Sequence, residues 1–213
     1  MISHKLRCIF IHIPKTGGMS IEKLLGSNLK KIHSEPMYIK HGYPNEWDYP
    51  KYWNNYFTFT FVRNPISRFL SSYKYNLYLA QKNKNLTKDR KAVLKYGLNG
   101  INKFVLYELD KTEERFWKPC VKWIDNFDYD FIGKLENFDN DIKIICNRLE
   151  ISYKKNFENK SKIRFRPNLI FKLNIIKSIS NMKLIYNYQN FLNKESIEIL
   201  KNIYQDDIKR FNY

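Results

Sequence analysis

The sequence predicts an α/β protein in which a central, mainly parallel sheet is flanked by helices. Residues 7–13 (RCIFIHI) and 56–62 (YFTFTFV) are apolar almost throughout, which is typical of strands that are buried on both faces. Each is followed by a turn and then by apolar residues at helical spacing. This alternation favours a parallel sheet, and ligands of such sheets bind beyond the carboxyl ends of the strands.

The first strand is expected to end at Pro14, and a helix is expected to begin at Gly18. Ile21, Leu24 and Leu25 recur at helical spacing, and Gly26 is a plausible C-cap. Residues 27–56 then show no clean period. A loop of that length in a compact domain is usually functional, and this one holds an aromatic cluster at Trp47, Tyr49, Tyr52, Trp53 and Tyr56.

After the second strand, Asn64 is expected to cap a long helix whose first residue is Pro65. One face of that helix carries Ile66, Phe69, Leu70, Tyr73, Leu77 and Ala80. The polar residues 81–91 suggest an exposed connection. Helices are expected near 100–109, 113–126, 137–149 and 193–211, with a short strand at 129–133 between them. The helix near 113–126 is expected to be interrupted or started by Pro119. No strong domain break is visible, so residues 1–213 are expected to form a single domain.

The chain is strongly basic, with 38 Lys and Arg against 21 Asp and Glu and a formal net charge of +17. A positive charge of this size favours polyanionic or phosphorylated partners. The alternative is that many of the lysines only lie on a solvated surface. The three cysteines are far apart and contain no CxxC pair, which argues against a disulfide framework or zinc site and suits a reducing compartment. The longest apolar run near the N-terminus has six residues, too few for a membrane span. We therefore expect a cytoplasmic protein that is not inserted in a membrane.

The turn after the first strand, KTGGMS (residues 15–20), has the composition of an anion-binding loop. Glycines allow main-chain N–H groups to approach an anion, and the following helix offers its N-terminal N–H groups. Lys15 adds a point charge, while Thr16 and Ser20 add hydroxyl groups. However, the lysine precedes the glycines, and no GK[ST] occurs in the chain, which disfavours an ordinary ATP- or GTP-binding loop. A plain strand-to-helix turn is the alternative.

The turn after the second strand is RNPISRFLS (residues 63–71). An arginine that leaves a strand, followed two helical turns later by a serine, can hold a phosphate between a guanidinium fork and a hydroxyl. Arg63 and Ser71 have this spacing, and Ser67 lies on the same helix face as Ser71. The alternative for such an arginine is an ordinary surface charge.

Together, FIHIPKTGGMSIEKLL and FTFVRNPISRFLSSYKY resemble the paired signatures of sulfotransferases that use 3′-phosphoadenylyl sulfate (PAPS), most closely the carbohydrate branch. KLENFDNDIKIICNRL and the final IEILKNIYQDDIKRFNY also resemble that branch, so the likeness covers nearly the whole chain. The resemblance implies a P-loop NTPase-like three-layer fold. It also implies a sulfonyl donor, PAPS, and a hydroxyl-bearing acceptor, a glycan or other carbohydrate that is acidic if it complements the basic surface.

The resemblance also implies roles for individual residues. The first turn would hold the 5′-phosphosulfate with Lys15, Thr16, Gly17, Gly18, Met19 and Ser20, and Arg63 and Ser71 would hold the 3′-phosphate. Met19 departs from the family, which commonly has a hydroxyl residue there. Residues 154–168 are strongly basic and include Lys160, Arg164 and Arg166. In the family that the chain resembles, a late basic loop closes over the cofactor, so the resemblance implies that this segment is such a lid or a patch that binds the acceptor. A solvated charge run is the alternative for that segment.

Sulfonyl transfer places an attacking hydroxyl and a leaving phosphate oxygen in line, so the protein mainly positions groups and stabilises charge. Lys15 is the cation best placed to neutralise the leaving oxygen. His41 is the first candidate for the general base and His33 the second, followed by Glu35 and Glu46. His12 is expected to orient the turn or to pack near the cofactor. No metal is expected.

Two other functions remain open. A small-molecule kinase on the same architecture is the nearest alternative, although the missing GK[ST] counts against it. The net charge of +17 also suits a nucleic-acid-binding protein, but the sequence shows none of the usual signatures and we expect no nucleic-acid partner.

Overall fold

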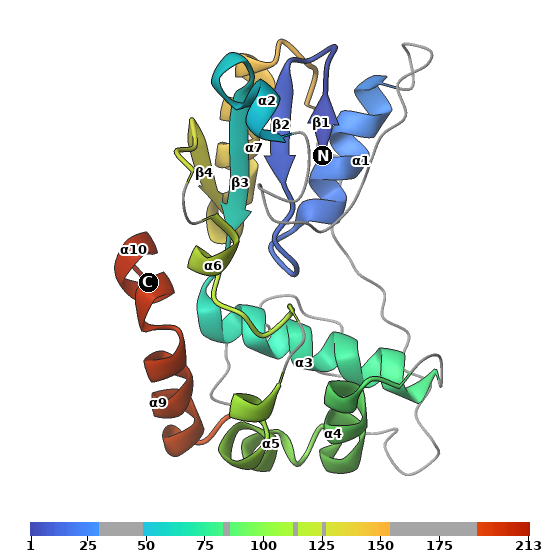
Figure 1. Cartoon of the computed structure of the whole chain (residues 1–213), viewed down its shortest axis with the longest axis vertical. Helices are drawn as coiled ribbons and strands as arrows, with labels where there is room; N and C mark the ends of the chain where they lie inside the picture. Colours follow the sequence, from blue (N-terminus) through green and yellow to red (C-terminus); the bar gives the residue numbers. More distant parts are fainter. Residues whose placement is uncertain (30–48, 83–85, 113–114, 125–126, 154–190) are drawn as a thin grey trace. The chain divides into compact units, whose positions relative to one another are not determined.

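The computed structural model describes residues 1–29, 49–82, 86–112, 115–124, 127–153 and 191–213. They belong to two compact units, each built from separate stretches of the chain (Figure 1). The first unit comprises Met1–Asn64, Lys118–Lys160 and Lys209–Tyr213, and the second comprises Pro65–Trp117 and Ser161–Ile208. The single domain expected from the sequence stays a prediction.

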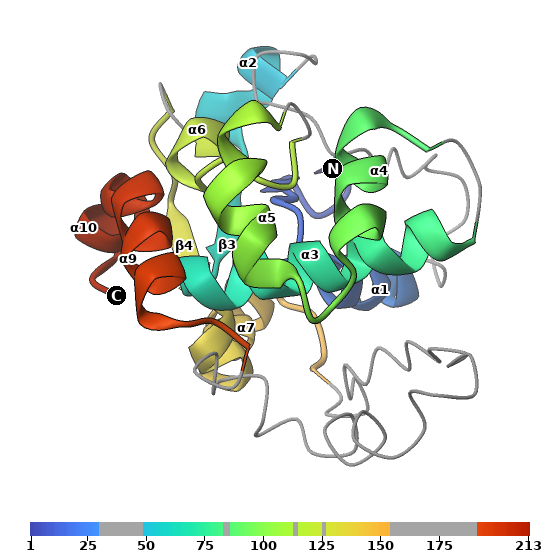
Figure 2. The ribbon, with the colours of Figure 1, turned by 90° about the horizontal axis from the view of Figure 1, so that it is seen from below.

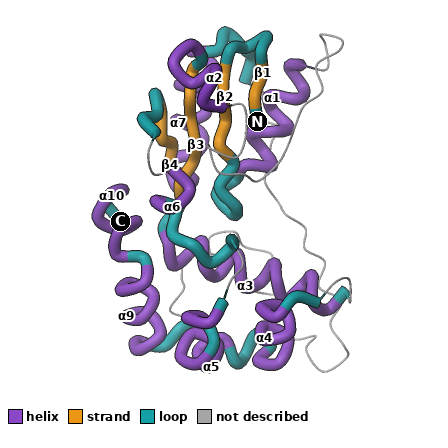
Figure 3. Tube along the Cα trace, viewed as in Figure 1, coloured by secondary structure: helices purple, strands orange, loops and turns teal. Residues whose placement is uncertain are grey.

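The first unit contains one sheet of four strands, in the order β1 (Ile2–Ser3), β2 (Cys8–Ile11), β3 (Phe57–Val62) and β4 (Phe131–Lys134). Figure 3 shows the four strands in orange. The pairs β2–β3 and β3–β4 are parallel, with Ile11 beside Thr60 and Val62 beside Lys134, whereas β1 is antiparallel to β2. The expected mainly parallel sheet is therefore confirmed, and β1 is an additional edge strand that the sequence did not indicate.

The side chains of a strand alternate between the two faces of the sheet, and in β2 and β3 the side chains on both faces are buried. Helices accordingly cover both faces. On one face, α1 (Gly18–Leu29) and α7 (Phe138–Arg148) pack against the strands. This core contains Cys8, Phe10, Ile21, Leu24, Leu25, Phe59, Phe61, Ile142, Ile145 and Cys146. The other face packs against α6 (Val121–Ile124) and against the residues that follow α2 (Tyr49–Tyr52), through Ile9, Ile11, Trp53, Val62, Cys120, Val121, Trp123 and Ile124.

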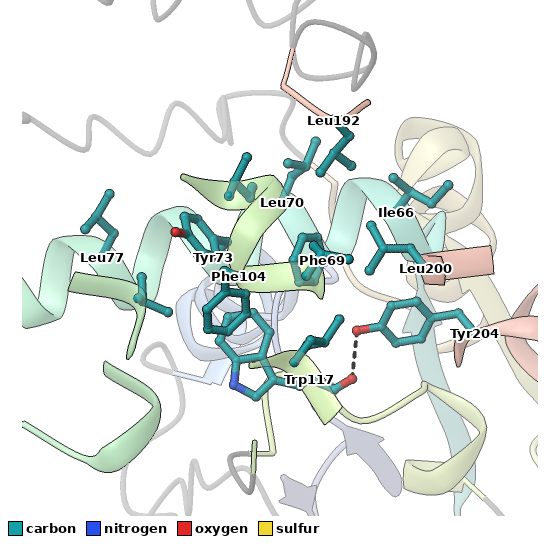
Figure 4. Packing of buried hydrophobic residues seen from close by; sticks show 14 residues of the cluster. Ile66, Phe69, Leu70, Tyr73, Leu77, Phe104, Trp117, Leu192, Leu200 and Tyr204 are labelled. Carbon is teal, nitrogen blue, oxygen red and sulfur yellow. Dashed lines mark hydrogen bonds between the residues drawn. The ribbon is translucent and has the colours of Figure 1, made fainter. Parts of the chain in front are cut away.

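The described residues of the second unit form helices, which Figure 2 shows from below. They are α3 (Pro65–Gln81), α4 (Lys88–Tyr96), α5 (Ile101–Tyr107), a short 3-10 helix (Leu109–Lys111) and α9 (Lys194–Ile203). The next helix, α10 (Gln205–Phe211), begins in this unit, and its last residues belong to the first. The apolar face expected on α3 is buried as a whole and packs around Phe104, Trp117, Leu200 and Tyr204 (Figure 4). Within this core the hydroxyl of Tyr204 donates to the Trp117 carbonyl oxygen at 2.8 Å.

Two of the expected helix boundaries are wrong. Gly26 does not cap the first helix, because α1 continues to Leu29 and Gly26 is itself buried, so packing outweighs the low helix propensity of glycine. Residues 88–91 are not an exposed connection, because Thr87 caps α4 by accepting from the Arg90 N–H, and Val93 is buried in the core. The polar composition of that stretch concealed its inward-facing residues.

Two other expected helices are shorter or divided. In the segment near 113–126, the described helix is the single turn of α6, which begins just after Pro119, as expected for a proline that has no N–H to continue a helix across it. The final helix is broken at Tyr204, whose main chain leaves helical values (φ −105°, ψ 21°) and separates α9 from α10. Asn193 caps α9 as expected, with its side chain accepting from the Ser196 N–H at 2.8 Å.

All three cysteines are buried, free thiols. In the part of the chain that the structure describes, no helix is long and apolar enough to cross a bilayer.

Candidate anion-binding site

The turn between β2 and α1 has an unusual main-chain conformation. Lys15 (φ 70°) and Gly17 (φ 92°) both lie in the left-handed region, which is costly for a lysine. Two hydrogen bonds close the turn: the Thr16 hydroxyl donates to the Ile13 carbonyl oxygen at 2.8 Å, and the Ser20 N–H donates to the Gly17 carbonyl oxygen at 3.0 Å. The turn therefore holds Lys15 in a strained conformation at the N-terminal end of α1.

The two glycines of this turn are required for different reasons. Gly17 has a positive φ, and a Cβ there would lie 2.7 Å from Leu135 Cδ1. A Cβ on Gly18 would lie 2.0 Å from His12 Cδ2, which is far inside van der Waals contact. Gly17 thus allows the turn to form, whereas Gly18 allows it to pack directly on the His12 ring.

His12 lies beneath the turn and is buried, with 5% of its surface exposed. Its Nδ1 contacts the Glu22 carboxylate on α1, and its ring stacks on Phe10 at a centroid distance of 5.7 Å. Because the same ring contacts Gly18, His12 links β2 to both the turn and the first turns of α1. This position agrees with the expectation that His12 orients the turn.

Arg63 follows β3 directly and is 8% exposed. Its Nη1 donates to the Lys15 carbonyl oxygen at 3.3 Å, so the two turns predicted to hold phosphate groups contact each other. Burial, and secondarily the charge of Arg63, lower the pKa of Lys15 to about 8. Lys15 and Arg63 are thus two partly desolvated cations at the carboxyl ends of adjacent parallel strands. An anion bound there would reduce the electrostatic repulsion between them.

The carboxyl end of β4 contributes a group that the sequence did not single out. Glu136 accepts a hydrogen bond from the Asn64 N–H at 2.8 Å through Oε1 and from the Tyr213 hydroxyl at 3.0 Å through Oε2. Lys134 lies over the Tyr213 ring, with Nζ 4.8 Å from the centroid. Glu136 lies in KLENF, which resembled the family, and its position three residues past an expected strand was the signal that could have identified it.

The other predicted site residues are placed as follows. Met19 is 79% exposed and Ser20 is buried, while Ser71 is partly exposed on α3. His33, Glu35, His41, Glu46, Lys160, Arg164 and Arg166 lie outside the described residues.

The aromatic cluster is divided between core and surface. Trp53 belongs to the core, and its Nε1 donates to the Asp128 carbonyl oxygen at 2.8 Å. Tyr52 and Tyr56 are partly buried and contact the exposed ring of His4. Trp47 is outside the described residues. Within those residues, no group of three or more His, Cys, Asp or Glu is arranged to hold a metal ion.

The fold and the two turns together define an α/β protein that carries two cationic turns at the carboxyl ends of its parallel strands, where ligands of such sheets bind. Residues 1–213, the whole chain, match the family model described as "Sulfotransferase family". The chain therefore belongs to the sulfotransferase family. Neither the comparison with curated proteins nor that with solved structures gives a significant match.

Family membership carries several coarse conclusions. The family's fold is a P-loop-like α/β fold, with which the four-stranded, mostly parallel sheet agrees. The protein is a transferase, its family transfers sulfonyl groups to hydroxyl-bearing acceptors, and the family generally uses PAPS.

Proposed function

We propose that this protein transfers the sulfonyl group of PAPS to a hydroxyl group of a carbohydrate. The observation that carries the proposal is the contact between Arg63 and the main chain of Lys15. It joins two cationic turns, one after β2 and one after β3, at the sheet edge where ligands of parallel sheets bind. PAPS has two separate anionic groups, a 5′-phosphosulfate and a 3′-phosphate, and two adjacent cationic turns suit such a donor.

The residues present fit this cofactor chemically. Lys15 supplies an ammonium group, Arg63 supplies a guanidinium fork, and α1 begins at Gly18 with main-chain N–H groups that have no partner earlier in the helix. This set of donors supports the proposed binding of a phosphate group.

We assign the first turn, Lys15, Thr16, Gly17, Gly18, Met19 and Ser20, to the 5′-phosphosulfate, and Arg63 with Ser71 to the 3′-phosphate. Within the first turn the contributions differ. The Thr16 hydroxyl already donates to Ile13, and Met19 has no polar side chain, so these two residues would contribute through their main-chain N–H groups. Lys15 would contribute through its charge.

In this proposal the bound donor supplies a sulfonyl group, and the reaction forms one S–O bond to the acceptor as the S–O bond to the phosphate breaks. Lys15 neutralises the negative charge that grows on the phosphate oxygen, and Arg63 holds the distant end of the nucleotide in place. A general base takes the proton of the acceptor hydroxyl. His41 remains the first candidate for that base and His33 the second, with Glu35 and Glu46 after them.

The acceptor class rests on the carbohydrate-branch motifs and on the charge. A net charge of +17 favours an acidic glycan over a neutral one. We propose that Lys160, Arg164 and Arg166 close over the cofactor or contact this acceptor. The three free thiols support a reducing, cytoplasmic location.

Calorimetric titration with 3′,5′-adenosine bisphosphate, the nucleotide product, tests the donor. In the presence of EDTA we expect micromolar affinity for the wild type and a loss of about tenfold or more in Lys15→Ala and in Arg63→Ala, since each removes a charge-assisted contact. Lys201→Ala, which removes an exposed lysine of α9 that pairs with Glu198, is the control and should bind as the wild type does.

Two results would contradict the proposal. Equal binding of ATP with Mg²⁺ would favour a kinase, and a steeply salt-dependent affinity for duplex DNA without bisphosphate binding would favour a nucleic-acid-binding protein. Once the donor is established, transfer of radiolabelled sulfonyl groups to a panel of neutral and acidic glycans identifies the acceptor class.

A further inference from the structure

The carboxylate of Glu136 contacts the main chain at the exit of β3. The Asn64 N–H is the last main-chain donor before α3, because Pro65 has no N–H. It donates to Glu136 Oε1 at 2.8 Å, and such a bond to a charged acceptor is stronger than one to a neutral acceptor. Asn64 is bonded directly to Arg63, so this contact orients the peptide from which the Arg63 side chain departs.

The second oxygen of the same carboxylate is held as well. Glu136 Oε2 accepts from the Tyr213 hydroxyl at 3.0 Å, and the Tyr213 ring lies beneath Lys134 Nζ. Tyr213 packs against the cluster that contains Ile13 and Val62, the residues near the ends of β2 and β3. Glu136 is thus fixed from both sides, by the β3 exit and by a tyrosine anchored in the core.

We propose that Glu136 is a positioning residue for the Arg63 turn and that Tyr213 supports it. This inference rests on the proposed function, in which Arg63 binds the 3′-phosphate. Glu136 keeps the β3 exit in one conformation before the nucleotide arrives, so less ordering is required when the 3′-phosphate binds.

The negative charge of Glu136 predicts the opposite effect on nucleotide binding. A carboxylate near a cationic site repels an anionic ligand, so if charge alone mattered, removal of Glu136 would strengthen nucleotide binding. If positioning dominates, removal of the Glu136 side chain weakens nucleotide binding. Glutamine at this position should restore binding, because its amide oxygen still accepts from the Asn64 N–H. The two effects have opposite signs.

The test compares the affinities of the full chain for 3′,5′-adenosine bisphosphate and for adenosine 5′-phosphate, which lacks the 3′-phosphate. In Glu136→Ala we expect bisphosphate affinity to fall by about 5- to 20-fold, while affinity for the monophosphate is unchanged. The loss is smaller than the full effect of a charge-assisted hydrogen bond because Glu136 is exposed and acts on the nucleotide only through the Arg63 turn. Glu136→Gln should stay within about threefold of the wild type. Tyr213→Phe should show a smaller loss of the same kind, and it should add little to Glu136→Ala because the two act as one unit.

Tyr153→Phe is the matched control, since the Tyr153 hydroxyl also donates to a carboxylate, that of Asp139, at 2.9 Å. It should change neither affinity, and thermal unfolding of every variant shows whether folding is intact. Tighter bisphosphate binding in Glu136→Ala, or an equal loss for both nucleotides, would overturn the inference.

The two proposals fail in different ways. If the wild type does not prefer the bisphosphate, the proposed function fails and the inference fails with it. If Arg63→Ala abolishes that preference while Glu136→Ala keeps it, the inference alone is wrong.

Discussion

The guanidinium group of Arg63 donates through Nη1 to the main-chain carbonyl oxygen of Lys15 at 3.3 Å, across 48 positions of sequence. This contact places the cation that follows β3 against the strained turn that follows β2. It also explains part of the electrostatics, because Arg63 is the second cause, after burial, of the lowered pKa of Lys15. The positively charged groups of Lys15 and Arg63 therefore interact with each other before any ligand binds.

Nucleotide binding should weaken as the pH rises through the pKa of Lys15, about 8. Above that pH the unliganded protein has lost the Lys15 proton, and binding an anion must bring it back. We expect bisphosphate affinity to fall by up to about tenfold per pH unit above 8, with proton uptake visible by calorimetry in buffers of different ionisation enthalpy. Lys15→Arg, which stays charged, should lack this dependence, and the same pH dependence in that variant would contradict the assignment.

Replacing Lys15 with methionine should stabilise the unliganded protein while abolishing nucleotide binding. The pKa of Lys15 is lowered from 10.5 to about 8, so the folded state holds this proton less tightly than the unfolded state does. At about 1.4 kcal/mol per unit, and with a reduction for partial exposure, the charge costs about 1–3 kcal/mol at pH 7. Methionine keeps the strain of the positive φ, so the comparison isolates the charge.

The same substitution has a defined pH dependence. Below pH 8 the Lys15 side chain is charged in both states and the cost is fully present. Between pH 8 and 10.5 the unfolded state binds more protons at Lys15 than the folded state does. The free energy of unfolding of the wild type therefore rises with pH in this range. Denaturation by urea should therefore show Lys15→Met as the more stable protein at pH 7, with a difference that shrinks towards pH 10. A difference independent of pH would show that the charge is not responsible.

Gly18→Ala should destabilise the protein by about 1–3 kcal/mol, because its Cβ would overlap the His12 ring. The penalty should be smaller in a His12→Ala background, where the ring is absent, and chemical denaturation of the four proteins measures the difference. Gly97→Ala is the control, since a Cβ there meets no atom within 4 Å and is opposed only by φ 59°. Its cost should be about 1–3 kcal/mol and the same in both backgrounds, because its main chain (φ 59°, ψ −168°) lies in a region that is favourable only for glycine. Equal penalties for Gly18→Ala in both backgrounds would exclude the His12 contact as the cause.

The thiols should resist modification in the folded protein. Cys8, Cys120 and Cys146 are all buried, and burial raises the pKa of Cys146 to about 11. At pH 8 we expect Ellman's reagent to react slowly with the native protein and to titrate all three thiols after unfolding in guanidinium. Prompt reaction of one thiol in the native state would show that a segment of the core opens readily.

Much of the fold was predictable because burial leaves a local pattern. The apolar runs around β2 and β3 and the spacing on α3 and α7 show which residues face a core, and the structure buries those residues. Boundaries were less predictable. Gly26 and the polar start of α4 were misassigned because packing and a Thr87 cap outweighed local composition.

The sequence by itself determined which segments form the parallel strands, which turns carry Lys15 and Arg63, and that the first helix begins at a pair of glycines, because these features depend on neighbouring residues. Tertiary structure decided what those turns contact: Gly18 lies on the His12 ring, and Arg63 reaches the Lys15 carbonyl oxygen. It also brought Glu136 to Asn64 and Tyr213, which are 72 and 77 positions away. Such contacts follow from strand order and register, which arise only when distant segments pair and which no local pattern specifies.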